Sequence, residues 1–419
     1  MINARQAALN TIQSVIGDKR SLSQIFDATK MRVHEADRAL YHTLVYDTLR
    51  NYRALSHIRD QLLSAPLRAN ARVPAILLNL GLWQLLRMNL GDHGVIHETV
   101  ALAEKNGSAR TKGLINAVLR RAQRERAHWQ QALDASLVRN LPDWLAQAHP
   151  QATEALAHAA SHPPPLTLRL NPTLDRDSWI AGMASASANP LAPQAVTLHK
   201  TLNVQQIPGF AEGQVSVQDA AAQQAALLLA PQNGERLLDA CAAPGGKTGH
   251  LLELAPQAEV VALDHDDARL ARVRDNLARL GQQAHIRHAD AADIAAWHDG
   301  KPFDAILLDA PCSGSGVLRR HPDIAFLREE RDLLRLPQTQ ARLLQALWHI
   351  LKPGGRLLYT TCSILPAENQ QVVKKFLARH ADARLLPIAP ALASNTGFGH
   401  LHLPDANGDG FFYALLGKS

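Results

Sequence analysis

The feature that most constrains the fold is the alternation of short apolar segments with helical segments after residue 235. Six segments have the length and apolar content of strands: RLLDA, EVVALD, AHIRHAD, FDAILLDA, GRLLYTT and GFFYALL. Stretches with helical periodicity alternate with them. Because strand–helix–strand units form right-handed crossovers between parallel strands, this pattern predicts a doubly wound, mostly parallel α/β domain over residues 231–419.

The rest of the chain has a different organisation. Residues 1–140 show helical periodicity throughout, with glycine and proline confined to junctions, which predicts an all-helical domain. Between 141 and 230, SHPPPLTLRLNP and SANPLAPQAV combine proline-rich loops with a short alternating strand, so we expect a small α+β linker domain. A chain of 419 residues is long enough for several packed cores.

Positive charge is concentrated in the predicted helical domain. Residues 1–140 contain 20 Lys and Arg against 11 Asp and Glu, a net charge of +9, whereas the remainder has 24 against 27, or −3. Much of the excess flanks an apolar stripe in residues 108–126, at Arg110, Lys112, Arg120, Arg121, Arg124 and Arg126. A solvated basic face is one interpretation of this helix, and a surface for polyanions is the other.

Cysteine usage and hydropathy indicate the compartment. Three cysteines are a sparse, odd number, and the N-terminal MINARQAALNTIQ lacks the pattern of a secretion signal. The most apolar helical stretch, residues 73–86, contains Asn79 and Gln84 and is shorter than the roughly 20 apolar residues that span a bilayer. We therefore expect a soluble, cytoplasmic protein with free thiols and no membrane partner.

The carboxyl ends of the predicted strands carry the chemistry, because ligands bind there in doubly wound sheets. The first strand leads into DACAAPGGKTGHLLELA (239–255), where Gly245 and Gly246 open a helix without the G-x-G-x-x-G spacing that seats a pyrophosphate. A tight turn is the alternative interpretation of this loop. The first four strands end in carboxylates, each of which could alone be a helix N-cap; they are Asp239, Asp264, Asp290 and Asp309.

These carboxylates predict a nucleoside cofactor. Asp264 lies about 20 residues after the glycine loop, the position of a carboxylate that binds a ribose diol. Asp290 is placed to accept a hydrogen bond from an adenine amino group. A ribose, an adenine and no pyrophosphate loop, in a site whose carboxylates favour a sulfonium, indicate S-adenosylmethionine (SAM) and a methyltransferase; no metal site is predicted.

Two cysteines follow adjacent predicted strands, Cys312 in LLDAPCSGSG and Cys362 in LLYTTCSILPAENQQVV. A single cysteine is most often a small core residue, but two at the substrate end of one sheet favour a chemical role. Carbon 5 of cytosine becomes nucleophilic only after a group such as a thiolate adds at carbon 6. One thiol would add, another group would assist release, and Asp309 is the candidate to hydrogen bond the N3 edge. A helix is expected to begin at Pro366.

Three motifs carry a family resemblance. DACAAPGGKT, DAPCSGSGVLRRHPDI and YTTCSILPAENQ resemble the signatures of the NOL1/NOP2/Sun RNA (cytosine-5) methyltransferases, in matching order and spacing over residues 215–419. KGLINAVLRR, within a basic helical domain, resembles the NusB-like RNA-binding domain. The combination is similar to the bacterial Sun (Fmu) subfamily, which methylates 16S ribosomal RNA.

The resemblance implies a Rossmann-like class I SAM-dependent methyltransferase acting on carbon 5 of one cytidine, position 967 in the standard rRNA numbering. It implies Cys362 as the nucleophile and Cys312 as the group that assists product release. The partner would be 16S ribosomal RNA, free or in a partly assembled small subunit. The cofactor-binding residues implied are Cys241, Ala242, Ala243, Pro244, Gly245, Gly246, Lys247, Asp264, Asp290 and Asp309.

Two other interpretations are considered. A DNA cytosine-5 methyltransferase would use the Pro-Cys thiol as its nucleophile and carry a later Glu-Asn-Val motif, a triplet that the sequence lacks, so we expect no DNA substrate. A NusB-like RNA-binding or antitermination factor with an inactive methyltransferase domain would bind RNA without transferring a methyl group. The full set of acids and thiols argues against it, and a methylation assay separates the two.

Overall fold

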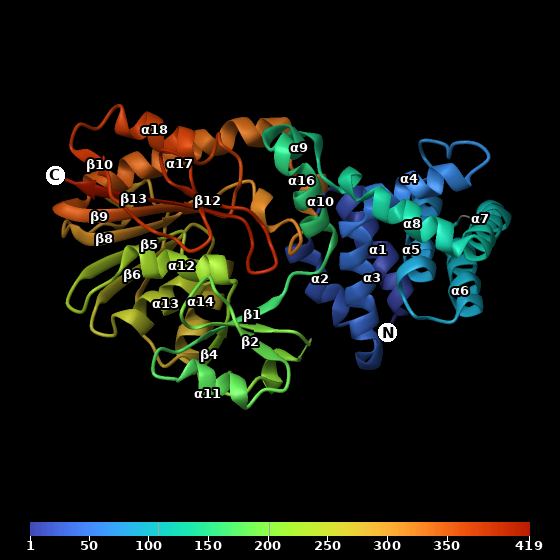
Figure 1. Ribbon diagram of the computed structural model, residues 1–419, viewed down its shortest axis with the longest axis horizontal. Helices are drawn as coiled ribbons and strands as arrows, with labels where there is room; N and C mark the ends of the chain where they lie inside the picture. Colours follow the sequence, from blue (N-terminus) through green and yellow to red (C-terminus); the bar gives the residue numbers. More distant parts are fainter. Residues whose placement is uncertain (108, 201) are drawn as a thin grey trace. The chain divides into compact units, whose positions relative to one another are not determined.

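The computed structural model describes residues 1–107, 109–200 and 202–419 (Figure 1). The chain forms two compact units, one of Met1–Pro163 with Leu318–Arg328 and the other of Pro164–Val317 with Glu329–Ser419. Ser108, the first residue of the predicted basic segment, lies outside the described residues.

The first unit is helical, as its periodicity predicts. Helix α5 is its most apolar element, and its side chains from Ile76 to Leu82 are all buried. It packs against α1, α3, α4, α6, α7 and α8. The ten helices described before Pro163 are α1 (Ala4–Ile16), α2 (Leu22–Lys30), α3 (Arg38–Arg50), α4 (Tyr52–Leu62), α5 (Arg72–Arg87), α6 (Asp92–Lys105), α7 (Lys112–Arg124), α8 (Arg126–Ala135), α9 (Asp143–Ala148) and α10 (Thr153–Ser161).

Within the described ranges, no helix has both the length and the hydropathy needed to cross a membrane.

Residues 318–328 belong to the helical unit although they come late in the sequence. They include α16 (Ile324–Leu327), drawn in orange beside the blue helices in Figure 1. The Phe326 side chain packs against the apolar core of the unit. Asp323 Oδ2 accepts a hydrogen bond from the Leu22 amide at 3.0 Å, at the first residue of α2.

The second unit begins with a small antiparallel sheet of strand order β2-β3-β1-β4. Its elements are β1 (Leu166–Leu170), α11 (Arg176–Ala181), β2 (Ala186–Ala188), β3 (Ala195–Leu198) and β4 (Val215–Val217). This is the mixed α+β structure expected between the two larger domains.

The large sheet has the order β11-β12-β13-β9-β8-β5-β6-β7, with β10 also paired to β13. Strands β5 to β9 are parallel, whereas β10 to β13 form an antiparallel edge. The predicted doubly wound fold is confirmed. The strands are β5 (Arg236–Ala240), β6 (Glu259–Asp264), β7 (His285–His288), β8 (Phe303–Asp309), β9 (Leu351–Thr361), β10 (Ala383–Leu385), β11 (Ser394–Asn395), β12 (His400–His402) and β13 (Phe411–Lys418).

Helices cover both faces of this sheet. One core is built with α12 (Ala220–Leu229), α13 (Gly246–Leu254) and α14 (Asp267–Arg279), and the other with α15 (Ile294–Trp297), α17 (Glu330–His349) and α18 (Gln370–Leu377).

Helix α18 begins at Gln370 and not at Pro366, where the sequence predicted its start. Residues 366–369 form a turn instead. The buried Glu368 side chain accepts a hydrogen bond from the Ser313 amide of the loop after β8, and the buried Asn369 side chain donates to the carbonyl of Ser363 in its own loop. These bonds hold the turn out of helical geometry.

The strand order defines where the sheet can bind a ligand. From β5 the chain continues to β6 and β7 on one side, whereas β8 and β9 lie on the other side of β5. The carboxyl ends of β5 and β8 therefore meet at the topological switch point, which is where ligands bind in open α/β sheets.

Candidate active site

The loop after β5 makes a close turn at the switch point. Cys241 has φ +65° and Gly245 has φ +96°. A Cβ on Gly245 would lie 3.1 Å from Cα of Val273, so neither the backbone conformation nor the space suits a larger residue. The Ala242 amide donates to the carbonyl of Leu263 at 2.8 Å, which ties the loop to the end of β6.

Asp264 holds the same loop with its side chain. It is 2% exposed at the end of β6. One carboxylate oxygen accepts a hydrogen bond from the Ala243 amide at 3.1 Å, and the other accepts one from the Asp266 amide at 3.1 Å. The predicted ribose-binding carboxylate thus lies directly against the glycine loop.

Asp290 is more exposed and lies two residues beyond β7. Its carboxylate accepts a hydrogen bond from the Ala292 amide at 2.9 Å and pairs with Arg342 at 2.9 Å. Partial burial works to raise the pKa of Asp290, but these hydrogen bonds and the guanidinium outweigh it and hold the pKa below its usual range.

Asp239 lies inside β5 and is fully buried. Its Oδ2 accepts a hydrogen bond from the Thr248 hydroxyl at 2.7 Å. No donor among the described residues reaches Oδ1. Burial, with a smaller contribution from the charge of Asp309, raises the pKa of Asp239 to about 7.

Lys247 connects the glycine loop to the end of β8. Its ammonium lies 2.6 Å from Oδ2 of Asp309 and 5.2 Å from the centroid of the Phe411 ring. Burial works to lower the pKa of Lys247, but the negative charge of Asp309 outweighs it and raises the pKa.

The two predicted catalytic thiols are in contact. Sγ of Cys312 lies 3.3 Å from Sγ of Cys362, and β8 and β9 bring them together through a register that pairs Asp309 with Thr360. The hydrogen bond to Cys362, followed by burial and the charge of Glu368, raises the pKa of Cys312.

Cys241 has a different environment. Burial, reinforced by the charges of Asp309 and Asp264, raises the pKa of its thiol. Because a thiol is a nucleophile only when deprotonated, this environment disfavours nucleophilic chemistry at Cys241.

Sequence reasoning missed a buried carboxylate beside the thiols. Glu368 is 0% exposed and accepts hydrogen bonds from the Ser313 amide at 2.8 Å and from the Ser313 hydroxyl at 2.6 Å. It also accepts hydrogen bonds from the Ser363 hydroxyl and from Gln340 Nε2. The repeated Cys-Ser dipeptide was the available signal, since a serine follows both Cys312 and Cys362.

Arg169, on β1, was also missed. Its guanidinium forms an ion pair with Glu253 at 2.7 Å and donates to the carbonyl of Gly246 at 2.9 Å. Both charged side chains are almost fully buried. The small antiparallel sheet therefore supports the start of α13.

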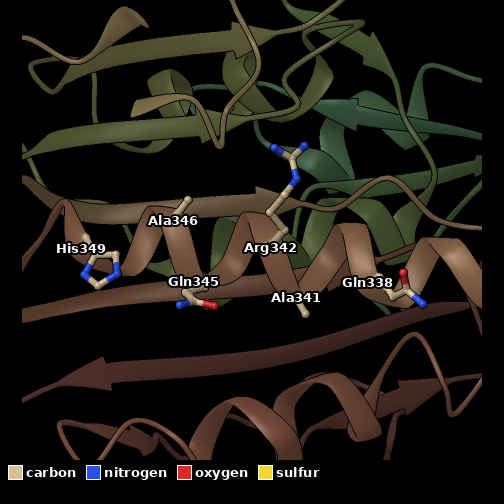
Figure 2. A pocket seen from close by; sticks show the side chains of 6 residues that line it. All are labelled: Gln338, Ala341, Arg342, Gln345, Ala346 and His349. Atoms are coloured by element: carbon tan, nitrogen blue, oxygen red, sulfur yellow. The ribbon is translucent and has the colours of Figure 1, made fainter. Parts of the chain in front are cut away.

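A hollow of about 540 Å³ lies along α17 and contains none of the predicted site residues (Figure 2). Its lining is Gln338, Ala341, Arg342, Gln345, Ala346 and His349. In Figure 2, Arg342 points away from the helix in the opposite direction to Gln345. Arg342 is its only link to the candidate site, through the ion pair with Asp290.

In the helical unit, several of the predicted basic side chains have acidic partners. Lys112 pairs with Glu104, Arg121 with Glu125, and Arg126 with Asp92. These pairs reduce the charge that the α7 segment offers to a polyanion.

A second hollow in the helical unit, of about 860 Å³, is lined by exposed arginines. They are Arg68, Arg72 and Arg110, and no acidic side chain is among the described residues that line the hollow. We call this feature the arginine hollow. Arg110 is the basic side chain of the predicted segment that lines it, together with its neighbours Ala109 and Thr111.

Comparison with known families matches both parts of the chain. A family model described as 16S rRNA methyltransferase RsmB/F matches residues 226–417, and one described as the NusB family matches residues 2–124. Ribosomal RNA small subunit methyltransferase B of Salmonella paratyphi B is 43% identical over 431 residues, which cover 99% of this chain and 99% of the relative. The protein of the same name from Klebsiella pneumoniae (strain 342) is 43% identical over 432 residues, covering 100% and 98%.

Solved structures share the fold. The structure of PH0851 covers 100% of this chain and 99% of its own, with a TM-score of 0.78 and 22% identity. A methyltransferase homologue from Pyrococcus horikoshii covers 66% and 94%, with a TM-score of 0.58 and 29% identity.

Proposed function

Because the chain belongs to the family of 16S rRNA methyltransferases RsmB/F, we propose that it uses two thiols to methylate carbon 5 of one cytidine in 16S ribosomal RNA. Family membership makes it a SAM-dependent rRNA methyltransferase. The observation that carries the cytosine-C5 chemistry is the contact between Sγ of Cys312 and Sγ of Cys362 at 3.3 Å, beside the carboxylate of Asp309. The resemblance to the Sun subfamily supports position 967 as the target.

The residues at the switch point suit SAM. Gly245 lets the loop turn tightly against Val273, and Asp264, at the end of β6, accepts the Ala243 amide of this loop. Asp290 lies two residues beyond the end of β7. The remaining members of the proposed cofactor site are Cys241, Ala242, Ala243, Pro244, Gly246, Lys247 and Asp309. When bound, SAM supplies an electrophilic methyl group.

Cys362 is the proposed nucleophile. Its thiolate forms a bond to carbon 6 of the cytosine and pushes an electron pair to carbon 5, which can then accept the methyl group. Asp309 holds the N3 edge of the base.

Cys312 assists release. Its environment raises the pKa of the thiol, so it stays protonated beside Cys362 while the adduct forms. A base takes the carbon 5 proton and the ring is restored. The bond between Cys362 and carbon 6 breaks with its electron pair returning to sulfur, to which the Cys312 thiol, 3.3 Å away, can donate its proton.

The two cysteine variants test these roles. Cys362→Ala is expected to abolish transfer of tritium from labelled SAM and to form no covalent protein–RNA species, because no carbon 5 nucleophile arises. Cys312→Ala is expected to transfer the methyl group once and then to accumulate an adduct that survives denaturing electrophoresis. An adduct found only with Cys362→Ala would exchange the two roles, and bisulfite sequencing of rRNA from a strain lacking the gene would identify the cytidine.

RNA capture is proposed to centre on the arginine hollow. Three exposed guanidiniums around a concave surface suit the phosphates of a folded RNA. A substrate of free rRNA or of a partly assembled subunit, in the cytoplasm, is consistent with this arrangement. An RNA-binding factor with an inactive methyltransferase domain would bind the same RNA but transfer no tritium.

A further inference from the structure

We propose that Glu368 is a positioning residue, a buried carboxylate that holds the Cys312 and Cys362 loops together and keeps their sulfur atoms in contact. The proposal deepens the function above and rests on the roles proposed there for the two thiols. The hydrogen bonds that support it, however, describe the geometry of the two loops and do not depend on those roles.

Each serine that follows a cysteine is bonded to this carboxylate. Ser313 donates its amide to Oε1 at 2.8 Å and its hydroxyl to Oε2 at 2.6 Å. Ser363 donates its hydroxyl to the same Oε2. One carboxylate therefore anchors the residues directly adjacent to both thiols, although they lie on loops after different strands.

The remaining bonds fix the carboxylate itself. Gln340, on α17, donates one amide hydrogen to Oε1 at 3.1 Å and the other to the carbonyl of Pro311 at 3.0 Å. The Tyr359 hydroxyl donates to the carbonyl of Glu368 at 2.5 Å. Each of the two carboxylate oxygens thus accepts two hydrogen bonds.

The serine hydroxyls add bonds between the loops. Ser315 and Ser363 share a hydroxyl–hydroxyl hydrogen bond at 3.1 Å, and the Ile364 amide donates to the Ser315 hydroxyl at 2.9 Å. The Gly316 amide donates to the carbonyl of Cys362 at 2.9 Å. Among the described residues, Glu368 is the acidic side chain whose hydrogen bonds join these two loops.

The charge of Glu368 also acts on Cys312. It raises the pKa of Cys312, behind the effects of the hydrogen bond to Cys362 and of burial. We call Glu368 with its three bonds to Ser313 and Ser363 the clamp.

Phenylarsine oxide tests the geometry without RNA or SAM. It condenses with two thiols that can reach one arsenic atom, forming two As–S bonds and releasing water, with no change of oxidation state. Wild-type protein should capture one equivalent, and Cys312→Ala and Cys362→Ala should not. Glu368→Gln keeps the side-chain length but places an amide NH2 group opposite the hydrogen-bond donors of Ser313, Ser363 and Gln340. The affinity of this variant for the arsenical should therefore fall on the order of tenfold or more.

Matched variants separate positioning from stability. Glu235→Gln removes a carboxylate that pairs with Arg356 at 2.7 Å, before β5, and should leave arsenical capture unchanged. Ser363→Ala removes the hydrogen bond from the Ser363 hydroxyl to Glu368 and replaces Glu368→Gln as the test variant if that protein folds poorly. With RNA, both clamp variants should lower kcat on the order of 10-fold to 100-fold at an unchanged KM and accumulate adduct, as with Cys312→Ala.

Each outcome is decisive. The clamp is overturned if Glu368→Gln and Ser363→Ala capture the arsenical as well as wild type does. It is also overturned if Glu235→Gln loses capture to the same extent, or if wild type captures no arsenical. Weakened capture in the clamp variants together with a wild type that methylates no rRNA would instead reject the proposed function and leave the clamp standing.

Discussion

At the scale of single residues, the buried carboxyl of Asp239 couples ionisation to folding. Its pKa is raised from 3.8 to about 7 in the folded chain, chiefly by burial. Between these two values the folded protein keeps a proton that the unfolded chain has released. The free energy of unfolding therefore falls as the pH rises through this window, because the folded state must either hold that proton or bury a charge.

Asp239→Asn should remove this dependence. One pKa unit corresponds to about 1.4 kcal/mol, so wild type should lose up to roughly 4 kcal/mol relative to the variant between pH 4 and pH 7. Denaturant unfolding at several pH values, without SAM, measures the difference. Asp267→Asn, at an exposed position on α14, is the control and should show the same pH dependence as wild type. If the free energy of unfolding of Asp239→Asn changed with pH in parallel with that of wild type, the raised pKa of Asp239 would be wrong.

At the scale of elements, α2 takes its N-terminal partner from a distant segment. Ser21 at its N-cap makes no capping bond with its side chain. The carboxylate of Asp323 accepts the Leu22 amide instead, and it also places a negative charge at the positive end of the helix dipole. Arg50 further secures the segment by donating to the carbonyl of Arg319 at 2.6 Å.

Asp323→Ala is therefore expected to lower the free energy of unfolding by about 0.5 to 2 kcal/mol, the range for loss of a helix cap. Asp323→Asn should lose less, because the amide oxygen still accepts the Leu22 hydrogen bond. Chemical denaturation followed by circular dichroism gives the values. If Asp18→Ala, at an exposed position of the same unit, cost as much, the capping role would be wrong.

At the scale of the whole molecule, we expect the charge distribution to govern RNA binding. The net charge of +9 over residues 1–140 contrasts with −3 over the rest. Acidic partners neutralise Lys112, Arg121 and Arg126, whereas the arginine hollow offers its charge to solvent.

Replacing Arg68, Arg72 and Arg110 by alanine should weaken RNA binding and flatten its salt dependence. Each lost phosphate contact lowers the slope of log K against log salt by about 0.7 to 0.9, because fewer counterions are released. Fluorescence titration of a 16S rRNA fragment at several salt concentrations measures the slope, and SAM affinity should stay constant. Arg121→Ala is the matched control, and an equal loss of slope there would show that the acidic partners do not mask α7.

Local sequence determined the elements and the positions of the reactive groups. Strand and helix periodicities are properties of adjacent residues, so the six strand segments after residue 235 were predicted without any tertiary information. The strand-end carboxylates and the two cysteines followed, because parallel strands bring their carboxyl ends to one edge whatever the details of packing.

Tertiary structure decided which of these groups touch and which partners hold them. Glu368 meets Ser313 across 55 positions, Arg169 meets Gly246 across 77, and Asp323 meets Leu22 across 301. Periodicity does not encode such pairs, since they depend on strand order, register and the path of the chain between its units. The start of α18 was predicted four residues too early, because the buried bonds of Glu368 to Ser313 and of Asn369 to Ser363 hold residues 366–369 in a turn.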